Sequence, residues 1–234
     1  TMNFSSHYNS TISYINIIRE FTTHHSSKYS YKLYRVIFSP LKKISTSAAL
    51  VLTAELSRWD DNSRNFIKPE IENWDADILR RFKQLGFFNL FNGSPKYLTD
   101  LENDTSKVNL VQYIKGRCGD SEKTRLLRDG LRTIIGESID KWTFLSSGVS
   151  EAITNVTHHA YPEAKGYQKE DKYWYLTGAH NTDTRELKIV FYDQGVTIPG
   201  SLPASEVWER LLSALSKIPL VDRHKDETML KAAV

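Results

Sequence analysis

The sequence has little cysteine, no long apolar run and little net charge. Cys118 is the single cysteine of 234 residues, so the chain forms no intramolecular disulfide, which is typical of a protein from a reducing compartment. One thiol is also too little for a cysteine-based metal site. The longest apolar stretch, around residues 48–54, is far shorter than the roughly 20 residues that a membrane-spanning helix needs. We therefore expect a cytoplasmic protein without membrane contact.

The charge of the chain is close to balanced. Its 31 basic and 28 acidic residues give a formal net charge of +3, and no dense run of Lys and Arg occurs. Proteins that bind nucleic acid usually carry a basic patch or stripe, so we expect no nucleic-acid partner. With 40% hydrophobic residues, the chain can bury a core as one or two domains.

The first 115 residues alternate between strand-like and helix-like patterns. Ser45 and Asp75 stand where N-terminal caps are expected, and Gly86 stands where a helix would end. The elements expected are a weak helix at 12–21, a strand at 31–38, a helix at 45–59, a short strand at 65–72, a helix at 75–85 and a strand at 108–115. This alternation predicts a small N-terminal α/β domain over residues 1–115.

In the rest of the chain, helices precede strands. The elements expected are helices at 126–135 and 142–161, strands at 173–179 and 187–192, and a helix at 205–216. Pro162 ends the long helix, and the polar residues 180–186 join the two strands as a hairpin. This order predicts an α/β sandwich over residues 116–234, not an alternating Rossmann arrangement.

Glu151 and Asn155 are the first candidate site residues. They lie four apart within the long helix and so share one of its faces. A carboxylate can orient and deprotonate a water molecule, and an amide oxygen can coordinate Mg²⁺. The same pair also occurs on many ordinary exposed helices, so the spacing alone does not decide between the two interpretations.

Asp193 and Gly195 form the second candidate. Asp193 ends an apolar strand, and its carboxylate can accept a hydrogen bond from an exocyclic amine such as that of adenine. Gly195 lacks a side chain, so a flat ring can approach its backbone closely. An ordinary turn after a strand would favour the same residue types.

Taken together, the two motifs resemble those of the GHKL ATPases, which include gyrase B, histidine kinases, mismatch-repair ATPases and bacterial anti-sigma-factor kinases. Glu151-x-x-x-Asn155 matches their N box, and Asp193-x-Gly195 matches the start of their G1 box. The resemblance covers residues 126–234 and implies a Bergerat-type ATP-binding fold with ATP and Mg²⁺ as cofactors. It implies that Glu151 is the catalytic base, Asn155 the Mg²⁺ ligand, and Asp193 and Gly195 the adenine-binding residues.

The sequence departs from this family in the residues around the phosphates. Thr197 stands where a second glycine is usual, and only Gly200 follows Pro199. The family's Gly-rich lid, whose backbone amides cradle the phosphates, is therefore expected beyond Val234 or is missing. Two interpretations stay open: an ATPase or Ser/Thr protein kinase with a regulatory protein partner, compatible with a homodimer, or a non-catalytic nucleotide-binding or protein-interaction module with a degenerate site.

Other signals refine this hypothesis. His159-Ala160-Tyr161 looks closest to the anti-sigma-factor kinase branch, and residues 1–115 faintly resemble a STAS domain, although an unrelated α/β domain fits equally well. His158 and His159 could bind a metal, but we expect one to pack and the other to face solvent. Residues 173–175 could stack bases, yet we expect them in a core sheet.

Overall fold

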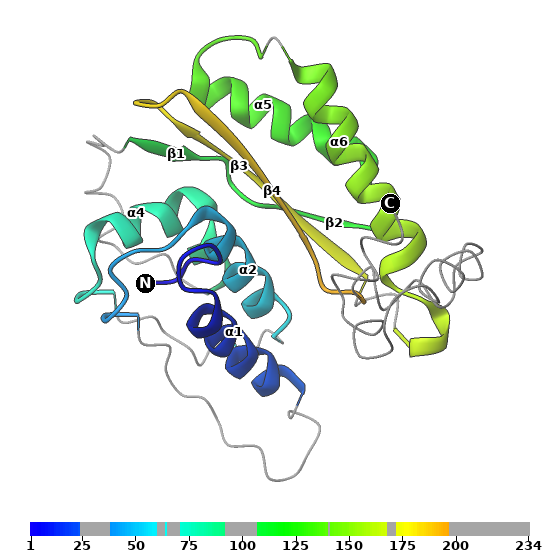
Figure 1. The fold of residues 1–234 in the computed structure, drawn as a ribbon, viewed down its shortest axis with the longest axis horizontal. Helices are drawn as coiled ribbons and strands as arrows, with labels where there is room; N and C mark the ends of the chain where they lie inside the picture. Colours follow the sequence, from blue (N-terminus) through cyan, green and yellow to red (C-terminus); the bar gives the residue numbers. More distant parts are fainter. Residues whose placement is uncertain are drawn as a thin grey trace, which may run out of the picture. The chain divides into compact units, whose positions relative to one another are not determined.

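The computed structural model of the chain describes residues 1–23, 38–59, 64, 71–91, 107–139, 141–167 and 172–196. It shows a mixed α/β protein (Figure 1). The chain divides into two compact units: unit 1 comprises Thr1–Lys115, Lys123–Trp142 and Tyr175–Tyr192, and unit 2 comprises Gly116–Glu122, Thr143–Trp174 and Asp193–Val234. Among the described residues, no helix combines the length and apolar character needed to cross a membrane.

Helices and strands follow one another in an order close to the expected one. The helices are α1 (Tyr8–Thr23), α2 (Thr46–Ser57), α4 (Ala76–Leu85), α5 (Thr124–Ile135) and α6 (Trp142–Asn155). Short helical turns are η2 (Phe87–Leu90), η4 (Ser121–Lys123), η5 (Val156–Ala160) and η6 (Glu163–Lys165). The strands are β1 (Val108–Leu110), β2 (Ile114–Arg117), β3 (Tyr173–Asn181) and β4 (Glu186–Asp193). The helix predicted at 205–216 lies outside the described residues.

The end signals of the predicted helices are confirmed in unit 1. The Ser45 side chain accepts a hydrogen bond from the Ala48 amide at the start of α2. Asp75 caps α4 in the same way through the Asp77 amide, and Gly86 ends α4 with a left-handed φ of 82°. A residue with a side chain is strained in that conformation, which explains why glycine occupies the position.

The strands predicted early in the chain fall almost wholly outside the described residues. Phe38, Ile71 and Glu72 are described and form no strand. Before residue 107, the described part of unit 1 contains helices, turns and irregular segments, and its strand pairing is a single parallel bridge between Met2 and Ile44. The predicted N-terminal α/β domain, its resemblance to a STAS domain and its boundary at residue 115 stay predictions.

Aromatic side chains form the core beside α4. Phe82 and Phe87 have ring centroids 4.3 Å apart, and the Phe38 ring lies edge-on to Trp74 at 4.9 Å. Phe88 and Phe91 extend the same cluster. Each of these side chains is at least nine-tenths buried. The apolar residues after Gly86 thus stabilise unit 1 mainly by burial and by edge-to-face ring packing.

The sheet is built around β3, with β1 and β2 on one of its edges and β4 pairing with it separately. β1 runs antiparallel to β3, with Val108 opposite Asn181. The single strand predicted at 108–115 is wrong, because residues 111–113 interrupt it. The Tyr113 amide donates to the carbonyl of Leu85, in the last turn of α4, instead of continuing a strand.

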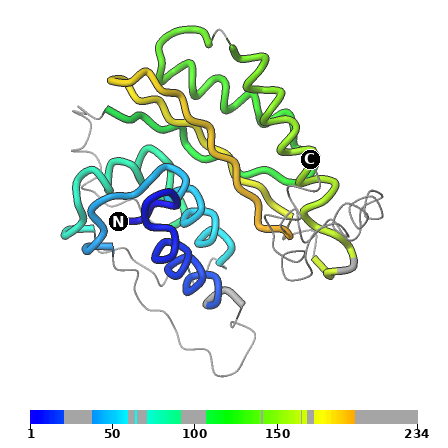
Figure 2. The backbone as a smooth tube through the Cα atoms, viewed as in Figure 1, coloured from blue at the N-terminus to red at the C-terminus, as the bar shows by residue number. Residues whose placement is uncertain are grey.

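β3 is buried on both faces within unit 1. Tyr175 and Leu176 point to opposite sides of the strand, and both are fully buried. The Tyr175 hydroxyl lies 2.6 Å from Ser57 Oγ of α2, which marks one face. On the other face α5 packs closely, because a Cβ at Gly178 would lie only 2.6 Å from Leu131 Cδ2. Figures 1 and 2 show the β3–β4 hairpin between these helices.

A buried ionic network joins α1, α2 and β4 in unit 1. The Glu55 side chain is fully buried, and its Oε1 accepts a hydrogen bond from Arg19 Nη2 at 2.8 Å. The Tyr192 hydroxyl donates to the same oxygen, and Arg58 Nη1 lies 3.9 Å from the other one. Burial and the nearby carboxylate both raise the pKa of Tyr192, so this hydroxyl keeps its proton and acts as a donor.

Candidate functional site

The helix α6 carries Glu151 and Asn155 in unit 2. Its buried positions are Val149 and Ile153, which hold one side of the helix against the unit. Glu151 and Asn155 are both exposed. Regular α-helical geometry continues through Asn155, so the spacing of four residues places the two side chains on one face, one turn apart. The pairing expected from the sequence is therefore compatible with the structure.

The long helix changes geometry directly after Asn155. Residues of η5 form a π-helical turn, so an uninterrupted α-helix to residue 161 is wrong. The Thr157 hydroxyl donates to the carbonyl of Ile153 at 2.8 Å, a back-bond that competes with regular helix hydrogen bonding. His158 and His159 follow within this turn, and both are exposed. The expectation that one of them packs is wrong, because neither side chain is buried in this turn.

The ends of β2 and β3 support this helix within unit 2. The Gly119 amide donates to Thr157 Oγ1 at 3.2 Å, which ties the loop after β2 to η5. Trp174 Nε1 donates to the carbonyl of Arg117 at 2.7 Å. A Cβ at Gly116 would lie 2.0 Å from Trp174 Cζ2, so only glycine fits beside this ring. Residues 173–175 therefore belong to the core sheet. This was the expectation from the sequence, with base stacking as the alternative.

The segment after β4 lies against the end of η5. The Val196 amide donates to the carbonyl of Ala160 at 2.7 Å. The Gln194 amide donates to the Tyr161 hydroxyl at 3.1 Å, and the Gly195 amide donates to Asp193 Oδ1 at 2.9 Å. The residues of the second motif thus lie against the C-terminal end of η5, the π-helical turn that follows the helix carrying Glu151 and Asn155.

Gly195 has a structural reason to be glycine in this position. A Cβ there would lie 2.1 Å from the Ala160 carbonyl oxygen and 2.7 Å from the Ala160 Cβ. The backbone of residue 195 therefore packs directly on the end of the helix. The sequence interpretation, in which a flat ring approaches this backbone, stays a prediction, and the contact with Ala160 is an additional constraint.

Asp193 is half-buried, and its carboxylate is hydrogen-bonded to the backbone. Burial raises the pKa of this carboxyl above its ordinary value, and the hydrogen bond from the Gly195 amide partly opposes that rise. Oδ1 accepts the Gly195 bond, and the Asp193 backbone amide also favours the charged carboxylate. An ionised carboxylate has about four acceptor sites, so it can also accept a hydrogen bond from a ligand amine.

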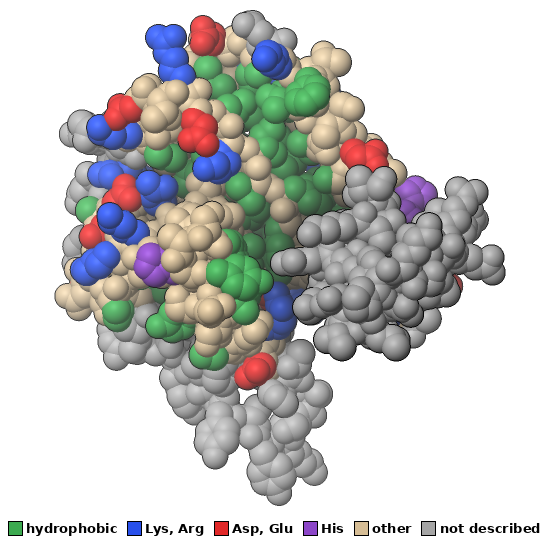
Figure 3. All heavy atoms as spheres, in the orientation of Figure 1, with side chains coloured by type: hydrophobic (Ala, Val, Ile, Leu, Met, Phe, Trp, Pro, Cys, Tyr) green, Lys and Arg blue, Asp and Glu red, His purple; other side chains and the backbone are tan. Residues whose placement is uncertain are grey.

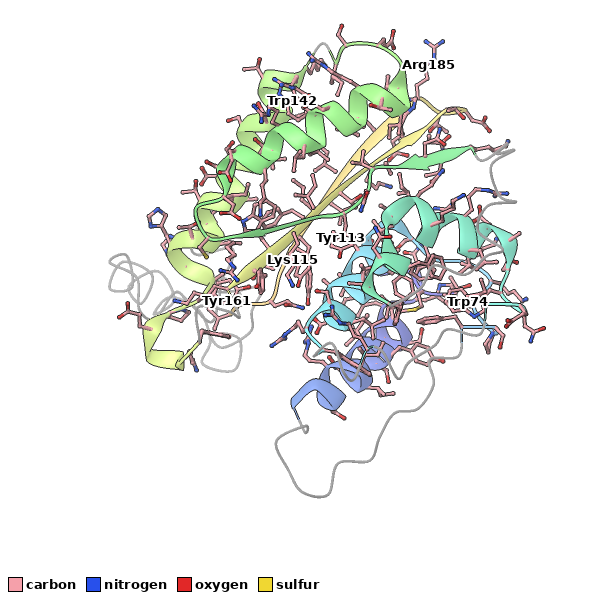
Figure 4. The ribbon with its side chains drawn as sticks, turned by 180° about the vertical axis from the view of Figure 1, so that it is seen from behind. Trp74, Tyr113, Lys115, Trp142, Tyr161 and Arg185 are labelled. Atoms are coloured by element: carbon pink, nitrogen blue, oxygen red, sulfur yellow. The ribbon has the colours of Figure 1, made fainter. Side chains whose placement is uncertain are left out.

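Sequence reasoning missed the role of Tyr161 and of the Ala160 carbonyl. Tyr161 is 7% exposed, and its hydroxyl also donates to the carbonyl of Tyr173 at the start of β3. Figure 4 labels this side chain at the end of the helix. The triplet His159-Ala160-Tyr161 was visible as a family-like pattern, but a pattern does not reveal which distant backbone groups a hydroxyl contacts.

The structure tests only part of the predicted site. Thr197, Gly200 and any phosphate-binding segment after them lie outside the described residues. Among the described residues, no group of three or more His, Cys, Asp or Glu side chains is placed to hold a metal ion. An Asn155 amide oxygen would suit Mg²⁺, which keeps several waters and takes few protein ligands.

Basic and acidic side chains are interspersed on the face drawn in Figure 3.

Comparison with known proteins adds no family assignment. No protein-family model, curated protein or solved structure matches this chain. The resemblance to GHKL ATPases therefore depends on the two motifs and on their local arrangement in unit 2.

Proposed function

We propose that residues 126–234 bind ATP with Mg²⁺ in the manner of a GHKL domain with a Bergerat-type fold. One observation supports this most. The segment Asp193–Val196 is hydrogen-bonded to the end of the helix that carries Glu151 and Asn155, through Ala160 and Tyr161. Both motifs thus belong to unit 2, and the segment that follows Asp193 contacts the residues that follow the Glu151–Asn155 helix, which supports a shared site.

Each side chain has a distinct proposed role. Asp193 accepts a hydrogen bond from the amino group of adenine through its carboxylate. Asn155 offers an amide oxygen to Mg²⁺, which when bound neutralises charge on the phosphates. Glu151 orients a water molecule and takes its proton, or takes a proton from a protein hydroxyl in a kinase reaction. Phosphoryl transfer depends mainly on positioning and charge stabilisation, so few reactive side chains suffice.

A second candidate function is nucleotide binding without turnover. It is favoured by Thr197, which stands where a second glycine is usual near the phosphates. In this case the domain would regulate a protein partner through its nucleotide-bound state. Asp193 would keep its role, while Glu151 would have no chemical one.

Calorimetric titration with ATP, with and without Mg²⁺, tests the proposal. We expect ATP binding that Mg²⁺ strengthens and that Asp193→Asn weakens by about tenfold, the effect of one lost charge-assisted hydrogen bond. Asp183→Asn, an exposed change in the β3–β4 turn, should leave binding unchanged. Binding with phosphate release supports an ATPase, and binding without it supports the second candidate. No ATP binding by the folded wild-type chain would refute both.

A further inference from the structure

The Tyr161 hydroxyl joins two backbone segments in unit 2 that are distant in the sequence. It donates to the carbonyl of Tyr173 and accepts from the Gln194 amide at 3.1 Å. A hydroxyl has one donor and two acceptor sites, so a single group can make both bonds at once. The ring is buried and packs edge-on against Tyr167 at 5.1 Å, which limits its movement.

The segment after β4, residues 194–196, is hydrogen-bonded to this hydroxyl. Three hydrogen bonds of its amides are found among the described residues, from Gln194, Gly195 and Val196. The Gly195 bond closes on Asp193 within the segment itself, and the Val196 bond goes to a backbone carbonyl. Among the described residues, Tyr161 therefore provides the side-chain hydrogen bond that holds this segment from outside.

The position of the Asp193 carboxylate follows from the position of this segment. Its Oδ1 is bound to the Gly195 amide, so a shift of residues 194 and 195 moves the carboxylate with them. Hydrogen bonds weaken steeply when the donor and acceptor are misaligned. A small displacement would thus impair recognition of one ligand group without opening the rest of the unit.

We infer that Tyr161 is a positioning residue that holds the Asp193 carboxylate where it discriminates a 6-aminopurine from a 6-oxopurine nucleotide. This inference rests on the proposed function. Adenine presents an amine donor to the carboxylate, whereas the 6-oxo group of hypoxanthine presents an acceptor and is repelled. Tyr161 acts on the choice of base through the backbone and contacts no ligand itself.

The experiment compares ATP with inosine triphosphate by calorimetry in the wild-type chain, Tyr161→Phe and Tyr167→Phe. The wild-type chain should prefer ATP. Tyr161→Phe should bind ATP about fivefold to tenfold more weakly, the effect of one misplaced hydrogen bond, while its affinity for inosine triphosphate changes less than about twofold. Tyr167→Phe removes a neighbouring phenol hydroxyl and should preserve the wild-type preference.

Two outcomes overturn the inference in distinguishable ways. Wild-type preference for ATP with an unchanged ratio in folded Tyr161→Phe would refute the positioning role alone. Binding of neither nucleotide by the wild-type chain would refute the proposed function as well. If Tyr161→Phe does not fold, amide exchange of Gln194 in the wild-type chain decides: ATP should protect it more than inosine triphosphate, and equal protection contradicts the inference.

Discussion

At the scale of the residue, Glu151 offers a test in which chemistry and folding are separable, because its side chain is exposed on α6. Glu151→Ala should lower the rate of ATP turnover by about 100- to 10,000-fold, the usual contribution of a general base. ATP affinity should change less than about threefold, since the carboxylate acts on water and not on the nucleotide. Phosphate release and calorimetry measure the two quantities. Glu163→Ala, at another exposed glutamate, is the matched control, and a wild-type rate in Glu151→Ala would exclude this residue as the base.

The pH dependence of ATP binding should report the ionisation of Asp193. Burial raises the pKa of this carboxyl from its ordinary value of 3.8, so it gains a proton at a higher pH than an exposed aspartate does. Because the carboxylate is the form that accepts a hydrogen bond from an amine most strongly, ATP affinity should fall as pH decreases through the raised pKa. The phosphates of ATP titrate in the same way in both experiments. The ratio of the wild-type affinity to the Asp193→Asn affinity therefore isolates the effect of Asp193. If this ratio stays constant as the pH is lowered, the assignment of Asp193 as the acceptor is contradicted.

The same raised pKa has the opposite consequence for folding. The folded chain favours the protonated carboxyl more than the unfolded chain does, so protonation of Asp193 stabilises the fold. This contribution is fully present below the pKa that Asp193 has in the unfolded chain. It is lost as pH rises through the folded pKa. Asp193 thus favours ligand recognition above its folded pKa at some expense of stability, a compromise common at binding sites.

At the scale of the element, helices were predictable where their signals are local. Ser45, Asp75 and Gly86 mark helix ends through bonds and backbone angles within a few residues, and the structure confirms them. The interruption at residues 111–113 was not predictable in this way. It depends on the Tyr113 amide meeting the Leu85 carbonyl, and no periodic pattern contains that pairing.

The candidate site shows the same division between local and distant information. Glu151, Asn155 and Asp193 could be selected from residue type, spacing and position at an element end. The π-helical turn and the contact of Gly195 with Ala160 could not, because both depend on how separate segments pack. The sequence therefore predicted which side chains to test, and the structure adds what holds them.

The network around Glu55 links α1, α2 and β4, and Tyr192 is its least disruptive position to change. Tyr192→Phe keeps the ring but removes a donor to a buried carboxylate. We expect the free energy of unfolding to fall by about 1.5–3 kcal/mol, the range for hydrogen bonds to charged groups. Urea denaturation measures this, with Tyr14→Phe on the exposed side of α1 as the control. Equal stability of the two variants would show that the bond contributes little.

At the scale of the whole molecule, the division into units differs from the order of the chain. Unit 1 takes up residues 175–192 of the hairpin and all of α5, whereas the candidate site residues Glu151, Asn155, Asp193 and Gly195 all belong to unit 2. A linear reading of the sequence cannot assign the two ends of one strand to different units. Asp193, the last residue of β4, is the clearest case, since the preceding Tyr192 belongs to unit 1.

Amide hydrogen exchange across the whole chain should therefore respond to ATP unevenly. We expect increased protection in peptides covering 149–161 and 193–196, because ligand contacts and the bonds to Ala160 and Tyr161 lie there. Peptides from α2 and α4 should exchange as before, since both helices belong to unit 1 and the proposed ligand contacts belong to unit 2. The Asp193→Asn variant provides the control. At the ATP concentration used for the wild-type chain, it should lose most of the protection of these two peptides. Protection that appears in α2 and α4 but not in 193–196 would assign the nucleotide to a different site and contradict the proposed function.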